Sequence, residues 1–274
     1  MKRIISLLLG FVLILPCMDL KTNATETSGT CGENLSWSLN EGTGVLHISG
    51  TGNMDDYGYS YSGYSQSGVT TPWYSKRFQI SEVVLDDGVT GIGNFAFYEC
   101  RKLTRVLLSP NTAQLGAYAF YNCRMLESIS GLENVTQMKE RVFYGCDSLD
   151  NIVLGNGLTV IPDRAFMACR NLKNIIIPDS VSSIECYAFH SCTSLEQINL
   201  PKGLKRLAYY AFCGCTALTD ITIPNSIKKI GTAAFCATAL EDITIPTGVR
   251  IIGEDVFAKC TSLTTVRPSP GLES

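Results

Sequence analysis

Residues 188–201 read Ala-Phe-His-Ser-Cys-Thr-Ser-Leu-Glu-Gln-Ile-Asn-Leu-Pro, and the pattern of this stretch recurs along the chain at intervals of 23 residues. The phenylalanine of this stretch has seven counterparts, each preceded by Ala or Val, and the last interval shortens to 22. The eight positions are Phe97, Phe120, Phe143, Phe166, Phe189, Phe212, Phe235 and Phe257. A fixed period of this length predicts a protein built from stacked repeats.

Each unit carries further residues at constant distances from its phenylalanine. A cysteine follows three residues later in seven units, at Cys100, Cys123, Cys146, Cys169, Cys192, Cys215 and Cys260, and Thr238 takes its place in the seventh unit. A leucine then opens a run of alternating apolar residues, such as Leu195, Ile198 and Leu200, which predicts a short strand. A proline such as Pro201 ends most of these strands, because it has no N–H for a ladder.

One such unit has too few apolar neighbours to fold alone, so the units must stack. Strands stacked side by side, about 4.8 Å apart, form a parallel sheet with a continuous core. We therefore expect a solenoid: a parallel β-sheet of about nine rungs with irregular return limbs. The strands are expected to begin near Ile80, Leu103, Leu126, Leu149, Leu172, Leu195, Leu218, Leu240 and Leu263.

The pattern Ala-Phe-x-x-Cys-x-x-Leu-x-x-Ile-x-Ile-Pro resembles the BspA-like, Treponema-type leucine-rich repeat of 23 residues. The resemblance spans about residues 80–267 and implies a leucine-rich repeat solenoid. The segment from Cys31 to Gly52, together with Pro72-Trp-Tyr74, looks like the N-terminal cap of secreted bacterial members. The family includes surface proteins implicated in adhesion to matrix proteins and other cells, so the resemblance implies a protein partner. It constrains the fold more than the ligand.

The N-terminal residues have the outline of a signal peptide. Lys2 and Arg3 precede an apolar run over residues 4–15, and cleavage is expected after Ala24. Lipidation of Cys17 is a weaker alternative, because Pro16 precedes it. The predicted organisation is a signal peptide over 1–24, a cap with a Tyr/Gly/Ser-rich loop over 25–79, and the solenoid over 80–274. We expect a secreted or cell-surface protein without a transmembrane segment in the mature chain.

Composition and motifs weigh against several classes of function. The 274 residues are 45% hydrophobic and 17% charged, and 22 Lys and Arg face 25 Asp and Glu, so no global positive field would attract nucleic acid. Two histidines leave little material for a metal site, and no cofactor is expected. The chain lacks G-x-S-x-G, H-E-x-x-H and a phosphate-binding glycine loop. Asp220 and Asp242 are read as solvated charges, so the predicted protein is not an enzyme.

The periodic cysteines predict buried thiols, although an exported chain with twelve cysteines would ordinarily suggest disulfides. The position three residues after the phenylalanine suits a small buried side chain with a weak S–H donor. Cys213 and Cys236 share a different column on neighbouring units, and a bridge between them stays open. Cys31 and Cys186 have no partner that the spacing identifies.

The cap region is expected to cover the edge of the first rung. Residues 37–39 and 45–48 predict a β-hairpin, in which His47 points away from the core. The loop that follows is rich in Tyr, Gly and Ser, a composition found in adaptable binding loops and also in loosely packed ones. Its candidate binding residues are Tyr57, Tyr59, Tyr61 and Tyr64.

The outward positions of the strands form the main candidate binding face. The candidate residues of this column are Leu107, Val153, Ile176, Asn199, Thr222 and Thr244. The aliphatic members indicate an exposed apolar strip that binds an extracellular or cell-surface protein, or one that a neighbouring protomer or limb covers. A second column just after the phenylalanines begins with Tyr98, Tyr121 and Tyr144, and it is either a contact stripe or packed against the return limb. The leading hypothesis is adhesion, and the alternative is a passive structural component of the cell envelope without a dedicated ligand.

Overall fold

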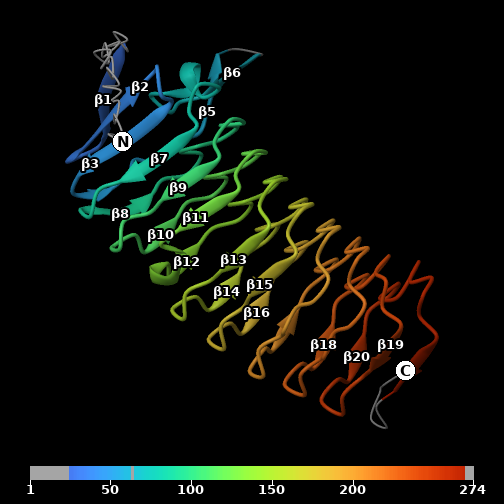
Figure 1. Cartoon of the computed structure of the whole chain (residues 1–274). Helices are drawn as coiled ribbons and strands as arrows, with labels where there is room; N and C mark the ends of the chain where they lie inside the picture. The colour runs from blue at the N-terminus through green and yellow to red at the C-terminus, as the bar shows by residue number, and fades with distance from the viewer. Residues whose placement is uncertain (1–24, 63–64, 269–274) are drawn as a thin grey trace, which may run out of the picture.

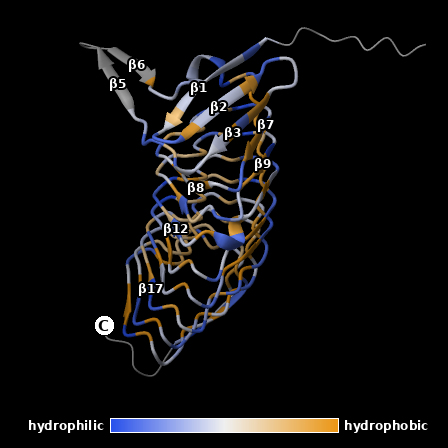
Figure 2. Ribbon diagram, turned by 90° about the vertical axis from the view of Figure 1, so that its left-hand side faces the viewer, coloured by the Kyte–Doolittle hydropathy of each residue, from blue (hydrophilic) through white to orange (hydrophobic). Residues whose placement is uncertain are grey.

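The computed structural model describes residues 25–62 and 65–268, and it shows an elongated solenoid that begins with an antiparallel cap (Figure 1). Each rung of the solenoid is one repeat unit. Most rungs add one strand to a front sheet and another to a back sheet, and the two sheets lie on opposite sides of the stack (Figure 2). The stacked-repeat architecture is therefore as the period predicts. The expected signal peptide lies outside the described residues.

The cap consists of three antiparallel strands, β1 (Glu26–Gly32), β2 (Leu35–Asn40) and β3 (Val45–Gly50). The turn between β2 and β3 is held by the side-chain oxygen of Asn40, which accepts hydrogen bonds from the backbone N–H groups of Gly42 and Thr43. Strand β3 pairs in parallel with β7 (Glu82–Leu85) and so covers the edge of the first rung. The predicted hairpin is confirmed, and β1 adds a strand that its polar sequence did not indicate.

The front sheet continues from β7 through β9 (Arg105–Leu107) and β11 (Ser128–Ser130) in register. Two separate pairs follow: β13 (Asn151–Val153) with β15 (Asn174–Ile176), and β19 (Asp242–Thr244) with β21 (Thr265–Arg267). Residues 197–199 and 220–222 occupy strand positions but form no ladder. The front sheet is thus interrupted where a continuous sheet was expected.

The back sheet shows that the return limbs are more regular than the sequence indicated. Its first part contains β4 (Gly52–Asn53), β8 (Val89–Ile92), β10 (Gln114–Leu115) and β12 (Gln137–Met138). Its second part contains β14 (Val160–Ile161), β16 (Ser183–Ile184), β17 (Arg206–Leu207), β18 (Lys229–Ile230) and β20 (Ile251–Ile252). In β14, β16, β17 and β18 the second residue is buried and the first is not, as expected for alternating side chains.

The phenylalanines form one stack of rings along the core. Neighbouring rings from Phe97 to Phe257 are nearly parallel, with centroids 5.2 to 6.0 Å apart. Trp73 of the cap begins the stack 5.7 Å from Phe97, and its indole N–H donates to the carbonyl oxygen of Ala96, 2.8 Å away. The core therefore runs without a break from the cap into the repeats.

The limb around each phenylalanine contains residues in the left-handed backbone conformation, which the spacing of the repeat does not predict. Two residues per rung, two positions before and two positions after the phenylalanine, have positive φ, and fourteen of these sixteen are not glycine. The conformation lets three N–H groups per rung point at the next rung: Phe143, for example, donates to Ala165, and Gly145 donates to Met167. These hydrogen bonds offset the steric cost of a left-handed conformation in residues with a Cβ.

Four shorter elements complete the described structure. Strands β5 (Tyr59–Ser62) and β6 (Ser65–Val69) form an antiparallel pair in the segment of chain that connects the cap strands to β7. The 3-10 helices η1 (Tyr74–Lys76) and η2 (Leu132–Asn134) each span three residues. Among the residues that the structure describes, no helix has the length and apolar character needed to cross a membrane.

Candidate functional site

Two exposed apolar residues of the front sheet lie together on β13 and β15. Val153 and Ile176 are 58% and 62% exposed, and they are direct partners in the register of the two strands. Ile152 and Ile175 point into the core between the outward positions, as the alternation predicts. Leu107 is half-buried, so the structure brings together two of the three aliphatic candidates.

Asparagines extend this surface along the same two strands. The side-chain N–H of Asn174 donates to the side-chain oxygen of Asn151, 3.2 Å away, and both residues are exposed. We refer to Asn151, Val153, Asn174 and Ile176 as the β13–β15 patch. It combines two apolar groups with amides that carry hydrogen-bond donors and acceptors, as the central parts of protein interfaces do.

The polar candidates Asn199, Thr222 and Thr244 are all exposed on later rungs of the same face. A hollow of about 310 Å³ opens there between residues 220–223 and 242–246, where the front sheet is interrupted. Asp220 and Asp242 line this hollow, and Asp242 is paired with the guanidinium of Arg267 at 3.0 Å. This part of the front face is therefore polar and acidic, whereas the β13–β15 patch exposes two aliphatic side chains.

The tyrosine candidates of the loop do not form one described surface. Tyr57 packs against the core, where its ring meets Trp73 edge-on at 6.0 Å and its hydroxyl donates to the carbonyl oxygen of Cys31. Burial raises the pKa of the Tyr57 hydroxyl, with smaller contributions from Cys31 and Asp55. The backbone of Tyr59 and Tyr61 lies in β5. The side chains of these two residues, and the whole of Tyr64, lie outside the described part of the chain.

The aromatic column after the phenylalanines packs with itself. Tyr98, Tyr121 and Tyr144 are half-buried and stack at 5.0 and 4.7 Å. A second aromatic column, two positions before the phenylalanines, was not predicted; in it Phe95 stacks on Tyr118 and Tyr187 stacks on Tyr210. Its sequence signal is that aromatic residues recur 23 residues apart at the position two before the phenylalanine, where φ is positive. Both columns cover the limb and favour the packing interpretation.

Six of the seven periodic cysteines are buried thiols, and Cys260 in the last unit is half-buried. All eleven cysteines of the described residues are free, including Cys213 and Cys236. The thiol of Cys192 donates to the carbonyl oxygen of Phe166 in the preceding rung, 3.1 Å away, and five other members make the same contact. Burial raises the pKa of Cys192 well above its usual range. Thr238 instead donates to Phe235 of its own rung, at 2.9 Å.

No metal site is found within residues 25–62 and 65–268, where no three His, Cys, Asp or Glu side chains converge as ligands. His47 of β3 is half-buried and pairs at 2.7 Å with the carboxylate of Asp86, which follows β7 of the first rung. His190 is also half-buried, and its pKa is lowered, mainly by burial. Each histidine therefore has a local structural environment, and the two lie in different parts of the fold.

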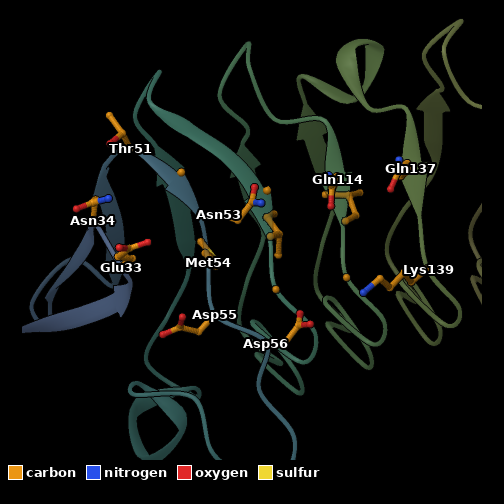
Figure 3. Close-up of a pocket in the computed structure, with 16 residues that line it drawn as sticks. Glu33, Asn34, Thr51, Asn53, Met54, Asp55, Asp56, Gln114, Gln137 and Lys139 are labelled. Carbon is orange, nitrogen blue, oxygen red and sulfur yellow. The ribbon is translucent and has the colours of Figure 1, made fainter.

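A hollow of about 480 Å³ lies where the cap meets the back sheet (Figure 3). The cap contributes Glu33, Asn34, Asp55 and Asp56, and successive rungs contribute Gln114, Gln137 and Lys139. Gly93 and Gly116 leave no room for a side chain, because a Cβ on either would lie within 2.4 Å of neighbouring backbone. The sequence analysis did not predict this hollow. Its sequence signal is the pair Gly93 and Gly116, which lie one repeat apart.

Comparison with known proteins agrees with this architecture. Residues 71–196 and 182–274 match the family model described as the BspA type leucine rich repeat region, in six copies. No curated protein matches the chain. A leucine-rich repeat protein from Eubacterium ventriosum ATCC 27560 is 27% identical with a TM-score of 0.63, and the match covers 89% of this chain and 72% of that chain.

Two further solved structures are similar. The leucine-rich repeat protein of T. pallidum is 25% identical with a TM-score of 0.56, over 86% of this chain and 90% of that chain. A leucine-rich repeat protein from Bacteroides ovatus ATCC 8483 is 22% identical with a TM-score of 0.66, over 88% of this chain and 77% of that chain. The latter likeness concerns the fold alone.

Proposed function

Because this chain belongs to the family of BspA-type leucine-rich repeat proteins, we propose that it is an exported, non-enzymatic scaffold that binds another protein. The signal-peptide pattern of residues 1–24 supports export, and a location outside the cell or on its surface follows from it. An extended stack of rungs offers a long surface and few deep cavities, which suits recognition of a macromolecule. Adhesion to matrix or to neighbouring cells is the form of binding that we propose.

The β13–β15 patch is the observation that carries this proposal. Val153 and Ile176 expose most of their side-chain surface to water, although aliphatic groups gain about 25 cal/mol for each Å² that becomes buried. Sheet residues elsewhere on this face are mostly polar, so the two aliphatic side chains are a local feature. A protein partner that covers them would recover this free energy, and the asparagines beside them would supply hydrogen bonds.

The test compares two doubly substituted proteins. Val153→Glu/Ile176→Glu places charges in the patch, and Asn156→Glu/Thr159→Glu places the same charges on exposed positions of the limb, outside the candidate binding residues. Leu107 is left unchanged because it is half-buried and its substitution would disturb packing. Binding of the mature protein to immobilised collagen, laminin, fibronectin and intact cells is measured by surface plasmon resonance and cell-attachment assays.

We expect the patch variant to lose binding and the control to retain it, with equal thermal stability. If both variants bind as the parent does, the patch is not the contact surface and attention moves to the loop with Tyr59, Tyr61 and Tyr64. If the parent binds none of these targets at micromolar concentration, the passive structural role is favoured.

A further inference from the structure

Basic residues gather on the back sheet of the last three rungs. Two adjacent columns of β17, β18 and β20 and the residues just before them hold Lys205, Arg206, Lys228, Lys229 and Arg250, and all five are exposed. We call these five residues the basic strip. In the two preceding rungs the same columns carry uncharged residues, Thr159 with Val160 and Ser182 with Ser183. The strip is therefore confined to one end of the solenoid.

The strip is only partly neutralised by carboxylates. Arg206 pairs with Glu185 at 3.1 Å, and the other oxygen of Glu185 accepts a hydrogen bond from Ser183. Among the described residues, no carboxylate lies within ion-pair distance of Lys205, Lys228 or Lys229. Neighbouring strands lie about 4.8 Å apart, so these like charges repel one another. The whole chain has a net charge of −3, so the strip is a local positive region on a protein that is negative overall.

A hollow of about 270 Å³ lies within the strip. Ala208 and Gly231 contribute to its lining, whereas the same column carries Lys139, Pro162 and Glu185 in the three preceding rungs and glycine only in the first two. A Cβ on Gly231 would come within 2.5 Å of the Ala208 backbone, so this position is restricted to glycine by close approach. Tyr209, which is 45% exposed, also lines the hollow and offers an apolar ring face with a hydroxyl at its edge.

We propose that the basic strip binds a linear anionic polysaccharide. The cations of successive rungs contact its sulfate or carboxylate groups, and one sugar ring lies in the hollow against Tyr209. The strip is two columns wide and follows the solenoid axis, which fits a chain-like polyanion better than a broad lipid surface. It lies on the back sheet, on the side of the stack where Figure 2 labels β17, whereas the β13–β15 patch belongs to the front sheet, so the strip is independent of the protein-binding surface proposed above.

The experiment uses the mature protein and two carbohydrate probes. Heparin carries sulfate and carboxylate groups, and polygalacturonate carries carboxylates alone. The strip variant is Lys205→Gln/Lys228→Gln/Lys229→Gln, and the matched control is Lys102→Gln/Lys139→Gln/Lys173→Gln, which removes three exposed lysines elsewhere. Affinity is measured at several salt concentrations, because ion contacts with a polyanion weaken as salt rises.

We expect the strip variant to bind heparin or polygalacturonate at least about tenfold more weakly than the parent, and the control to change less than about twofold. Tyr209→Ala should weaken binding of the polysaccharide but leave binding of inorganic polyphosphate, which has no sugar ring, unchanged. Binding of one carbohydrate probe and not the other identifies which anionic group is recognised, and either result supports the proposal.

Several outcomes overturn the proposal. Absence of binding to both carbohydrates at about 50 mM salt is one, since long-range attraction is strong at that ionic strength. An equal loss in the control is another, because it would reflect overall charge. Equal affinity for single-stranded DNA or polyglutamate, insensitive to Tyr209, would reassign the strip to another class of polyanion. Sedimentation velocity tests self-association. If the parent self-associates and only the strip variant does not, the strip binds the acidic front face of a second copy.

Discussion

The thiol of Cys169 donates a hydrogen bond to the carbonyl oxygen of Phe143, which lies 26 residues earlier and 3.1 Å away. This contact joins the two most regular positions of the sequence across the boundary between consecutive rungs. The cysteine is small enough to fit beside the ring stack, and its S–H group satisfies a carbonyl that would otherwise be buried with one fewer partner. The paired periods of Phe and Cys are thus two parts of one packing arrangement.

Removal of one ring from the middle of the stack should be costly. Phe166 is fully buried, with Phe143 at 5.5 Å on one side and Phe189 at 5.4 Å on the other. We expect Phe166→Ala to lower the free energy of unfolding by about 3 to 5 kcal/mol, because it leaves a cavity that two rungs cannot fill. Urea unfolding followed by circular dichroism measures the change. Lys173→Ala, on the exposed face, is the control, and equal stability of the two variants would contradict the stacked core.

The buried cysteines should be protected from reagents in the folded protein. Cys186, Cys236 and Cys260 are half-buried, whereas Cys123, Cys169 and Cys192 are fully enclosed. Buried thiols with a raised pKa have little thiolate, which is the reactive form. Iodoacetamide at about pH 8, followed by mass spectrometry, should label the three half-buried cysteines first and the enclosed cysteines only after unfolding. Comparison with and without reductant also counts any bridge, and several bridges would overturn the buried-thiol account.

Stability should decline at alkaline pH because of the same thiols. Burial raises the pKa of Cys169 above the ordinary thiol value of 9.0. Above that pH the unfolded chain releases the proton and the folded chain keeps it, so unfolding becomes more favourable as pH rises. Each such thiol lowers the free energy of unfolding by up to about 1.4 kcal/mol per pH unit until its folded-state pKa is reached.

The measurement is urea unfolding between about pH 8 and pH 10 for the parent and for Cys169→Ala, since the window opens at the unfolded thiol pKa. Tyrosine and lysine titrations affect both proteins, so the difference between the two slopes isolates one thiol. We expect a shallower decline for Cys169→Ala. Identical slopes would show that Cys169 titrates alike in the folded and unfolded states.

The left-handed residues of the limb offer a test of backbone strain. Ala237 has φ of 55° and donates its N–H to Ala258 at 2.7 Å, and the equivalent positions of two other rungs are Gly145 and Gly214. Ala237→Gly removes the Cβ clash of this conformation, which offsets the greater freedom of glycine in the unfolded chain. We expect the free energy of unfolding to stay unchanged or to rise by up to about 1 kcal/mol.

Ala217 is the matched control, because it is half-buried in a neighbouring rung and has no positive φ. Ala217→Gly should lower the free energy of unfolding by about 0.5 to 1 kcal/mol, since only the entropy cost applies. The melting temperature should therefore fall for Ala217→Gly and stay the same or rise for Ala237→Gly. A larger loss for Ala237→Gly than for Ala217→Gly would show that its methyl packing outweighs the strain.

Much of the architecture was predictable from residues at fixed spacing. Phe189 and Cys192 belong to columns whose environment is the same in each rung, so their burial follows once stacking is assumed. The hairpin of β2 and β3 was predictable for a similar reason, since alternation and a turn sequence are local signals. Strand β1 was not, because Glu26–Gly32 is polar and pairs only after β2 exists.

The candidate surfaces were predictable only in part. Alternation placed Val153 and Ile176 on the outer face, and the structure shows them exposed and paired. The same argument gave no way to know that Leu107 is half-buried or that Tyr57 packs against Trp73, because both depend on what lies across from them. The basic strip was not predictable either, because its lysines lie in the return limb, whose sequence has no strong strand pattern.

The sequence by itself determined the period, the stacking of one unit on the next and the identity of the core columns, because identical spacing brings identical side chains into contact wherever the rungs stack. Only the tertiary structure decided where the front sheet breaks, which backbone groups adopt positive φ, and which outward side chains stay exposed. Those features depend on hydrogen bonds and neighbours supplied by the adjacent rung or the cap, and these lie 22 or more residues away along the chain.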